Sequence, residues 1–148
     1  MDTMGSIHLY LYLFFHTYVL PILLHGLEAL VLNQSDILKL ETYYRNLLKH
    51  IQHLPASTAN AAVYLLLGAL PMEGHIDVQT LNFFNRIALS KDTIEWKIVQ
   101  RQLALNDMTS KSWTVYVRKI LRKYNLPSAF ELFQNPLEKS QFKRIVKE

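Results

Sequence analysis

The segment Ile37–Leu54, ILKLETYYRNLLKHIQHL, decides the fold because its apolar residues recur at steps of three and four. That spacing is typical of an amphipathic helix with one buried face. Ser35 is expected to cap the helix and Pro55 to stop it, since serine accepts from a first-turn N–H and proline has no N–H to donate. Glu41 and Arg45, four residues apart, predict a supporting ion pair. The apolar positions are Ile37, Leu40, Tyr44, Leu47, Leu48, Ile51 and Leu54.

Helical patterns also flank this segment. Upstream, a first apolar segment is expected to end near Tyr18 and to be followed by a helix over Pro21–Leu32, since proline is tolerated in a first turn. Downstream, Ser57 or Thr58 is expected to cap a shorter helix that Gly68 ends, because glycine readily adopts the left-handed conformation of a helix C-terminus.

The second half of the chain continues the same pattern. Further helices are expected to begin at Pro71, Lys91, Ser110 and Ser128, the third of these after an Asn-Asp loop, and a basic tail is expected from Lys139. The apolar positions assigned to the helix opening at Lys91 are Ile94, Ile98 and Leu105. No segment alternates with period two. The sequence therefore predicts an all-α fold, an irregular bundle of about six to seven helices with short connections.

Composition limits the possible functions. The 148 residues are 50% hydrophobic and 19% charged, which is richer in apolar residues than an isolated globular domain needs. The absence of cysteine excludes disulfides, thiolate metal sites and a cysteine nucleophile. Residues 1–90 carry four basic against six acidic residues, whereas residues 91–148 carry twelve against six. This basic second half is suited either to phosphate or to a solvated surface.

An apolar run over residues 7–32 is long enough to cross a bilayer. Three features argue against a span: histidines interrupt the run, Pro21 lies in its middle, and no Lys or Arg precedes Lys39 to set an orientation. A secretory signal would need a positive start, and Asp2 is the only charged residue there, so an intracellular location is favoured over secretion. A helix buried in protein is the preferred interpretation, with a membrane segment as the alternative.

Four motifs occur in order along the chain: VLPILLHGLEAL, LETYYRNLLKHIQHLP, STANAAVYLLLGALPMEGHI and RQLALNDMTSKSWTVYVRKILRKYNLPSAFEL. Their order and spacing resemble the segment that follows the polymerase core in reverse transcriptases of LINE-type (non-LTR) retrotransposons. The resemblance extends over residues 17–148. It implies a thumb-like helical segment over residues 17–90 and a basic connection segment with its tail over residues 91–148. Residues 1–16 would then be an apolar extension recruited upstream of a truncated element.

The resemblance also implies that the catalytic palm is missing. A polymerase holds two metal ions with paired carboxylates, and no two aspartates are adjacent in this chain. We therefore expect no enzymatic activity and no cofactor, and the parent protein's palm would be the absent partner. Two positions depart from the family pattern, because Ile22 replaces a residue that is usually basic and His25 one that is usually tyrosine. Both changes suggest a decaying copy.

Two basic groups are candidates for contact with the backbone of RNA or an RNA–DNA hybrid, because cations held at helical spacing can follow phosphates. The family's thumb lays a helix along the duplex, which favours the first group; a solvated face is the alternative for both. The first group, at steps of four on one helix, is Arg45, Lys49 and His53. The second, in a stretch without acidic residues, is Lys111, Arg118, Lys119, Arg122 and Lys123. The apolar face opposite the second group is Trp113, Tyr116, Val117, Ile120, Leu121 and Tyr124.

Other chemistry finds little support. His50 and His53 have a metal-ligand spacing but no nearby third ligand, so no metal site is predicted. The glycines are isolated, which excludes a glycine-rich phosphate loop.

Four hypotheses remain. The first is a catalytically inactive reverse transcriptase fragment that binds RNA or an RNA–DNA duplex non-specifically. The second is a helical protein-interaction module, whose binding would be lost on polar substitution at Leu66 or Phe83. The third is a small membrane protein anchored through residues 7–32. The fourth is a remnant without function.

Overall fold

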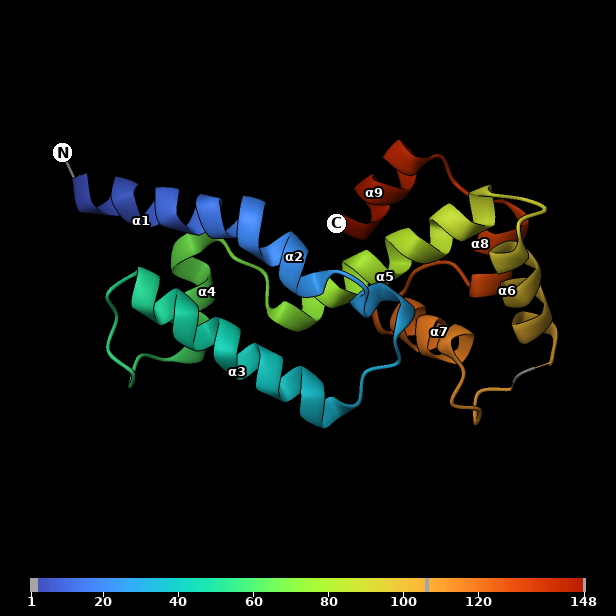
Figure 1. The fold of residues 1–148 in the computed structure, drawn as a ribbon, viewed down its shortest axis with the longest axis horizontal. Coiled ribbons are helices and arrows are strands. Elements are labelled where there is room, and N and C mark those ends of the chain that lie inside the picture. The colour runs from blue at the N-terminus through green and yellow to red at the C-terminus, as the bar shows by residue number, and fades with distance from the viewer. Residues whose placement is uncertain (1–2, 106, 148) are drawn as a thin grey trace. The chain divides into compact units, whose positions relative to one another are not determined.

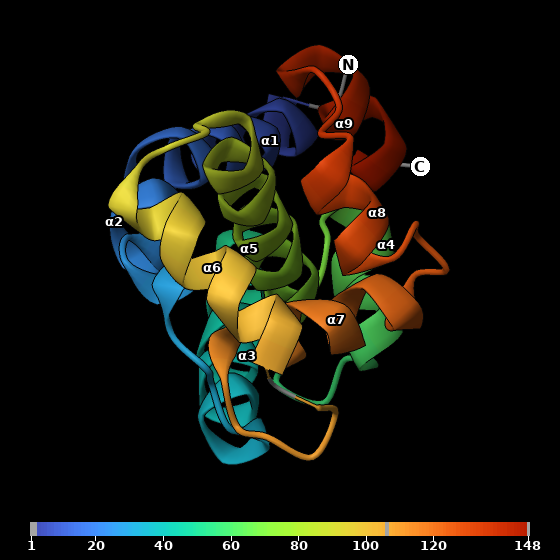
Figure 2. The ribbon, with the colours of Figure 1, turned by 90° about the vertical axis from the view of Figure 1, so that its right-hand side faces the viewer.

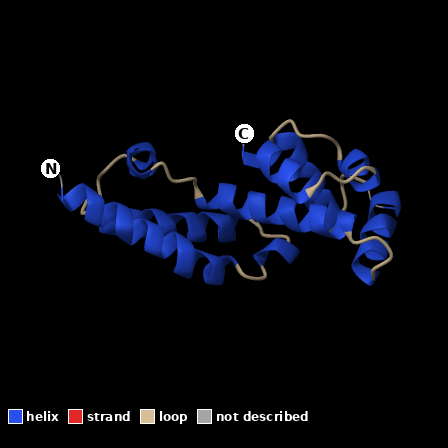
Figure 3. Ribbon diagram, turned by 90° about the horizontal axis from the view of Figure 1, so that it is seen from above, coloured by secondary structure: helices blue, strands red, loops and turns tan. Residues whose placement is uncertain are grey.

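A computed structural model describes the backbone of residues 3–105 and 107–147, and the side chains of residues 7–105 and 107–146. The described residues are helical without strands, so the predicted all-α class is confirmed (Figure 3). Short loops join the elements. The α-helices are α1 (Thr3–Phe14), α2 (Leu20–Leu24), α3 (Gln34–Ile51), α4 (Asn60–Leu67), α5 (Met72–Leu89), α6 (Ile94–Leu105), α7 (Trp113–Lys123), α8 (Ala129–Gln134) and α9 (Lys139–Lys147). A π-helical turn, η1 (Phe15–Val19), and a 3-10 turn, η2 (Leu27–Ala29), complete the list.

The chain divides into two compact units. Unit 1 comprises Met1–His25 and Leu32–His75, and unit 2 comprises Gly26–Val31 and Ile76–Glu148. Residues 17–90 contribute to both units. The short insert Gly26–Val31 is tied to unit 2 by Glu28, whose carboxylate accepts from Gln79 Nε2 at 2.7 Å and whose carbonyl accepts from Trp113 Nε1 at 2.8 Å.

In unit 1, α1, η1 and α2 follow one another without a break and are called the N-terminal rod below (Figure 1). Pro21 lies in the first turn of α2, as predicted, but the expected helix over Pro21–Leu32 is wrong because α2 ends at Leu24. Gly26 follows with φ +84°, a left-handed conformation that breaks the helix. Just before Pro21, which has no N–H to donate, the Leu20 N–H donates to the Phe15 carbonyl five residues earlier. This π-type hydrogen bond shifts the pattern of backbone hydrogen bonds by one residue.

Helix α3 confirms the helix predicted around Tyr44, but both of its ends differ from expectation. The cap is Asn33, whose Oδ1 accepts from the Asp36 N–H at 2.8 Å, so the assignment of Ser35 as the cap is wrong. Asparagine here reaches the third N–H of the helix from an extended backbone, which satisfies an otherwise unpaired donor. The helix ends at Ile51, before the predicted stop at Pro55.

Helix α4 begins at Asn60 after Ala59, which has no capping side chain, so neither Ser57 nor Thr58 caps it. Its C-terminus is as predicted: Gly68 has φ +63° and its N–H bonds back to the carbonyls of the last turn. Gln52 connects α3 to α4, because its side-chain amide donates to the Val63 carbonyl at 3.1 Å.

The interior of unit 1 contains a fully buried Tyr44, which packs against the ring of Phe15 from the rod at a centroid distance of 5.9 Å. Glu41 does not use its carboxylate for the expected helical pair with Arg45. It accepts instead from the Tyr64 hydroxyl and from the Glu73 N–H. The carboxylate therefore connects α3, α4 and the start of α5. The sequence of α3 alone could not predict these contacts.

The core of unit 2 is larger and continuous. Helix α5 supplies one wall, and α6, α7, α8 and α9 each contribute to the rest (Figure 2). Its largest fully buried members, Phe84 and Phe142, come from α5 and α9. The buried members are Leu81, Phe84, Ile87, Ala88, Val99, Leu103, Val117, Ile120, Leu121, Ala129, Leu132, Phe133 and Phe142.

Three details of unit 2 correct the sequence prediction. Helix α6 buries Val99 and Leu103, whereas the apolar positions expected to face the core, Ile94, Ile98 and Leu105, are 51–75% exposed. The cap of α7 is Ser112, which accepts from the Val115 N–H at 3.4 Å, in place of Ser110. The expected basic tail is the helix α9. Asn106, in the predicted Asn-Asp loop, lies outside the described residues.

Candidate nucleic-acid interface

Helix α7 is strongly amphipathic, as its sequence predicts. Its inner face is fixed in the core of unit 2 by Val117, Ile120 and Leu121, all at most 4% exposed. Trp113 extends this face and packs edge-on against Phe83 at a centroid distance of 5.5 Å. Because the inner face cannot turn away from the core, the direction in which the outer face points is set by packing.

The basic residues of this helix divide into two kinds. Lys119 and Arg122 are exposed, and in the part of the chain that the structure describes neither forms an ion pair or a hydrogen bond. Lys111 is also exposed and lies in the loop just before the cap of α7. Arg118 is half-buried and its guanidinium lies 5.1 Å from the ring centroid of Phe130. These side chains leave three cations fully available to a polyanion.

Lys123 has a different role. Its ammonium lies 2.9 Å from a carboxylate oxygen of Asp77, whose side chain is 4% exposed, and the Tyr124 hydroxyl donates to the same oxygen at 2.7 Å. Burial, and then this hydrogen bond, raises the pKa of Tyr124. Lys123 thus neutralises a buried carboxylate, and a phosphate would have to compete with that internal partner.

The first predicted group, Arg45, Lys49 and His53, does not form a continuous stripe. Lys49 is buried and its ammonium donates to the Ala56 carbonyl at 2.8 Å. His53 lies beyond the end of α3, with φ +53°, so it has left the helical register on which the step of four depended. Arg45 is half-buried near Tyr64, where its charge opposes the rise in that tyrosine's pKa.

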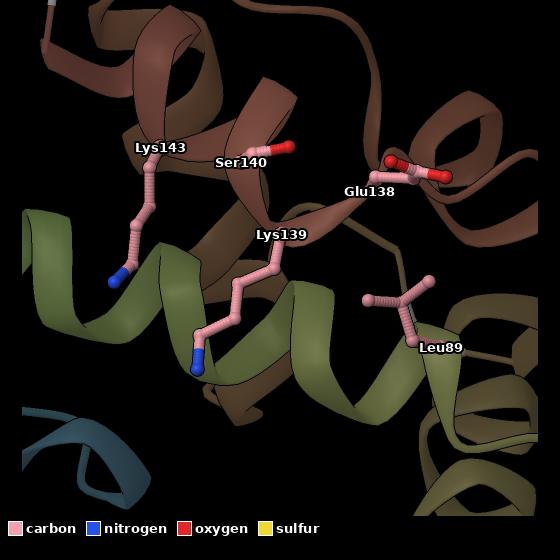
Figure 4. A pocket seen from close by; sticks show the side chains of 5 residues that line it. All are labelled: Leu89, Glu138, Lys139, Ser140 and Lys143. Carbon is pink, nitrogen blue, oxygen red and sulfur yellow. The ribbon is translucent and has the colours of Figure 1, made fainter.

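Helix α9 adds cations that sequence reasoning missed. Lys139 and Lys143, one turn apart, extend from α9 toward α5 and border an open depression of about 620 Å³ that also includes Leu89 (Figure 4). Phe142 anchors the helix and is 2% exposed. The sequence signal for this helix is a pair of lysines four residues apart with Phe142 between them, which is compatible with a tail until the structure shows that the phenylalanine is buried.

The interior of unit 1 holds a second concentration of polar groups. Burial, and then the hydrogen bond to Glu41, raises the pKa of Tyr64 to about 12. Burial and the neighbouring His16 lower the pKa of His75, while Glu41 acts in the opposite direction. Among the residues described, no three His, Asp or Glu side chains come together in a way that would hold a metal ion.

The N-terminal rod contains the one segment, among the described residues, that is long and apolar enough to cross a membrane. This window, Ile7–Leu24, has a mean hydropathy of 1.6, and 22% of it is buried. Length and composition alone support this, and the core helix of a soluble protein or a signal sequence has the same properties.

Comparisons with models of protein families, with curated proteins and with solved structures found no match for this chain. The resemblance to LINE-type reverse transcriptases therefore rests on the four motifs of the sequence alone. Any function must accordingly be argued from the residues themselves.

Proposed function

We propose that this chain is a catalytically inactive, thumb-like fragment of a retrotransposon reverse transcriptase that binds RNA or an RNA–DNA hybrid without sequence preference. The contact surface would be the outer face of α7 with the preceding loop: Lys111, Lys119 and Arg122. The observation that carries the proposal is the exposure of these three cations beside a helix face that the core holds in place. No acidic residue occurs in the sequence between Lys111 and Tyr124.

Phosphate contact explains why such a surface would bind without reading sequence. Cations neutralise backbone charge and release counterions, whereas base identity is read by contacts to base edges. Each neutralised phosphate contributes a slope of roughly −0.9 for a duplex to the dependence of log affinity on log salt. Three cations thus predict a slope of about −2 to −3, and a micromolar or weaker dissociation constant near physiological salt.

The group on α3 is the weaker candidate. Lys49 would have to break its bond to the Ala56 carbonyl before reaching a phosphate, and His53 does not continue the line of Arg45. We therefore place the principal contact on α7, although the family resemblance by itself favours the helix that is now α3.

The test is fluorescence anisotropy of a labelled RNA–DNA hybrid across a salt series. Lys119→Ala/Arg122→Ala is expected to weaken binding and to reduce the salt slope by about two, one for each lost phosphate contact. The matched control is Lys91→Ala/Lys97→Ala, which removes the same charge from exposed positions on and before α6. Arg45→Ala/Lys49→Ala tests the other group.

Two results would contradict the proposal. One is the absence of binding at low salt by a chain whose circular dichroism shows it folded. The other is an equal loss in the α6 control, which would mean that total charge matters and the face of α7 does not.

A second candidate function, membrane anchoring through the N-terminal rod, is favoured by the exposure of its apolar side chains. Nine of them are 42–77% exposed. These are Ile7, Leu9, Tyr10, Leu11, Leu13, Phe14, Tyr18, Val19 and Ile22. Flotation with neutral lipid vesicles, resistant to alkaline washing and abolished by Leu13→Asp/Ile22→Asp, would support anchoring. Recovery of the wild-type chain wholly in the aqueous fraction would exclude it.

For the alternative of a protein-interaction module, only one of the two suggested substitutions tests docking. Leu66 is 66% exposed and suits a test by polar substitution. Phe83 packs on the core of unit 2 and against Trp113, so its substitution would test folding and not docking.

A further inference from the structure

Two pairs of histidines attach the N-terminal rod to the rest of unit 1. His8 in α1 faces His53 just past the end of α3, with ring centroids 5.1 Å apart. His16 in η1 faces His75 in the first turn of α5, with centroids 5.4 Å apart. Each pair joins the rod to a residue far along the chain, and the two pairs lie two turns apart on the rod.

The pair His16–His75 lies among partly buried groups. The ring of His75 meets Tyr44 edge-on at 5.9 Å, and Glu41 acts on it from α3. Within the rod, the ring centroids of Tyr12 and His16 are 5.9 Å apart. The Nε2 atom of His75 is buried and has no hydrogen-bond partner in the structure. A charged imidazolium would therefore be poorly solvated here, and Glu41, whose oxygens bind Tyr64 and Glu73, offers partial compensation.

The sign of the resulting pH dependence is fixed by the direction of the shift. Burial, and then His16, lowers the pKa of His75 from its ordinary value of 6.5. The neutral form is thus favoured in the folded unit, so its stabilising contribution is present above pH 6.5 and is lost as the pH falls below it. Charging both members of a pair adds repulsion across the contact.

Each pair combines an exposed histidine, His16 or His53, with a half-buried one, His75 or His8. The lysine or arginine nearest to His53 in the sequence is Lys49, whose ammonium donates to the Ala56 carbonyl. On the rod, no Asp, Glu, Lys or Arg occurs between Asp2 and Glu28. Apart from its tyrosines, the histidines are therefore the only ionisable side chains of the rod.

We propose that the two histidine pairs form a pH-sensitive latch: uncharged imidazoles hold the N-terminal rod on the rest of unit 1 at neutral pH, and protonation of both pairs releases the rod in mild acid. Release would uncover the buried side of the rod, where Phe15 packs on Tyr44. This inference is independent of nucleic-acid binding, which we assign to unit 2.

The experiment is hydrogen–deuterium exchange of the whole chain at pH 7.5 and pH 5.5, expressed as protection factors so that the intrinsic pH dependence of exchange is removed. Protection of the amides over residues 7–24 is expected to fall about tenfold or more in acid, which corresponds to a loss of about 1.4 kcal/mol in the free energy of opening. Protection of α7, in unit 2, is expected to stay constant.

Substitutions assign the effect to the pairs. His16→Gln/His75→Gln should keep the rod protected at pH 5.5, as should His8→Gln/His53→Gln to a smaller extent. The matched control, His25→Gln/His50→Gln, removes two exposed histidines outside the pairs and should leave the pH dependence unchanged. His8→Lys/His53→Lys places permanent charges at one pair and should lower protection of the rod already at pH 7.5.

Three results would overturn the proposal. One is protection of the rod that does not change with pH. Another is an acid-induced loss that survives removal of both pairs. The third is a parallel loss in α7, because that would be general unfolding and not release of the rod. A glutamine variant that fails to fold leaves the lysine variant, read at neutral pH, as the deciding measurement.

Discussion

The two units differ in how completely they bury their apolar side chains. Unit 2 collects apolar side chains from five helices into one core, whereas unit 1 has a smaller apolar interior; both units also contain buried polar groups, such as Gln52 in unit 1 and Asp77 in unit 2. Of the twenty-two large apolar side chains that are exposed among the described residues, fourteen belong to unit 1, although it is the shorter unit. Unit 2 therefore has the properties of a helical domain with its own core. In unit 1, the apolar surface is only partly buried within the unit.

The largest expected effect tests the core of unit 2. Phe84→Ala removes a fully buried ring that neighbours Trp113 and Phe133, and should cost about 3–5 kcal/mol of unfolding free energy. Urea denaturation followed by tryptophan fluorescence measures this, because both tryptophans lie in unit 2. Leu65→Ala, at an 80% exposed position of unit 1, should change stability by less than about 0.5 kcal/mol by circular dichroism. An equally large loss for Leu65→Ala would break the comparison, since that surface would then be covered.

A smaller effect tests the buried charge. Asp77→Ala removes the partner of Lys123 and Tyr124 and should cost about 2 kcal/mol, in the range for hydrogen bonds to charged groups. Asp36→Ala is the control, because its contact with Lys39 spans 3.9 Å on an exposed turn and should contribute less than about 0.5 kcal/mol. Equal losses in denaturant titrations would mean that burial of Asp77 does not decide its contribution.

Capping provides a test within unit 1. Asn33→Ala should cost about 1 kcal/mol because it removes the acceptor for the Asp36 N–H, whereas Ser35→Ala should have little effect. Thermal unfolding by circular dichroism compares the two variants. If Ser35→Ala were the more destabilising, the cap assigned from the structure would be wrong and the one predicted from the sequence correct.

The smallest effect is expected at alkaline pH. Because the pKa of Tyr64 is raised to about 12, its neutral form stabilises unit 1 fully below pH 10, and this contribution is lost as the pH rises toward 12. Solvent exposure of this side chain limits the size of the effect. Tyr64→Phe should flatten the decline in stability between pH 10 and pH 12, measured by denaturation. A decline that is identical in the variant would assign it to other tyrosines.

Local signals in the sequence were sufficient for much of the fold. The three- and four-residue steps of α3 and α7, Gly68 at the end of α4 and Pro21 in a first turn all act within a few residues, so they could be read directly. Cap assignments failed where two neighbouring polar residues could both cap, because the choice depends on which residue first leaves the extended conformation.

The candidate site was predicted less well, for a related reason. Lys49, Lys119 and Lys123 look alike in the sequence, yet one donates to a backbone carbonyl, one is exposed and one neutralises Asp77. No residue near Lys123 in the sequence indicates that its partner is the carboxylate of Asp77, 46 positions earlier.

The sequence by itself determined the all-helical class, the amphipathic faces and the basic character of the second half, because these depend on residue type and short-range spacing. The tertiary structure alone decided which cations remain available and which histidines meet. His8 and His16 find His53 and His75 only after the rod packs on unit 1. Contacts between distant residues depend on how helices pack, and packing is not encoded in any single helix.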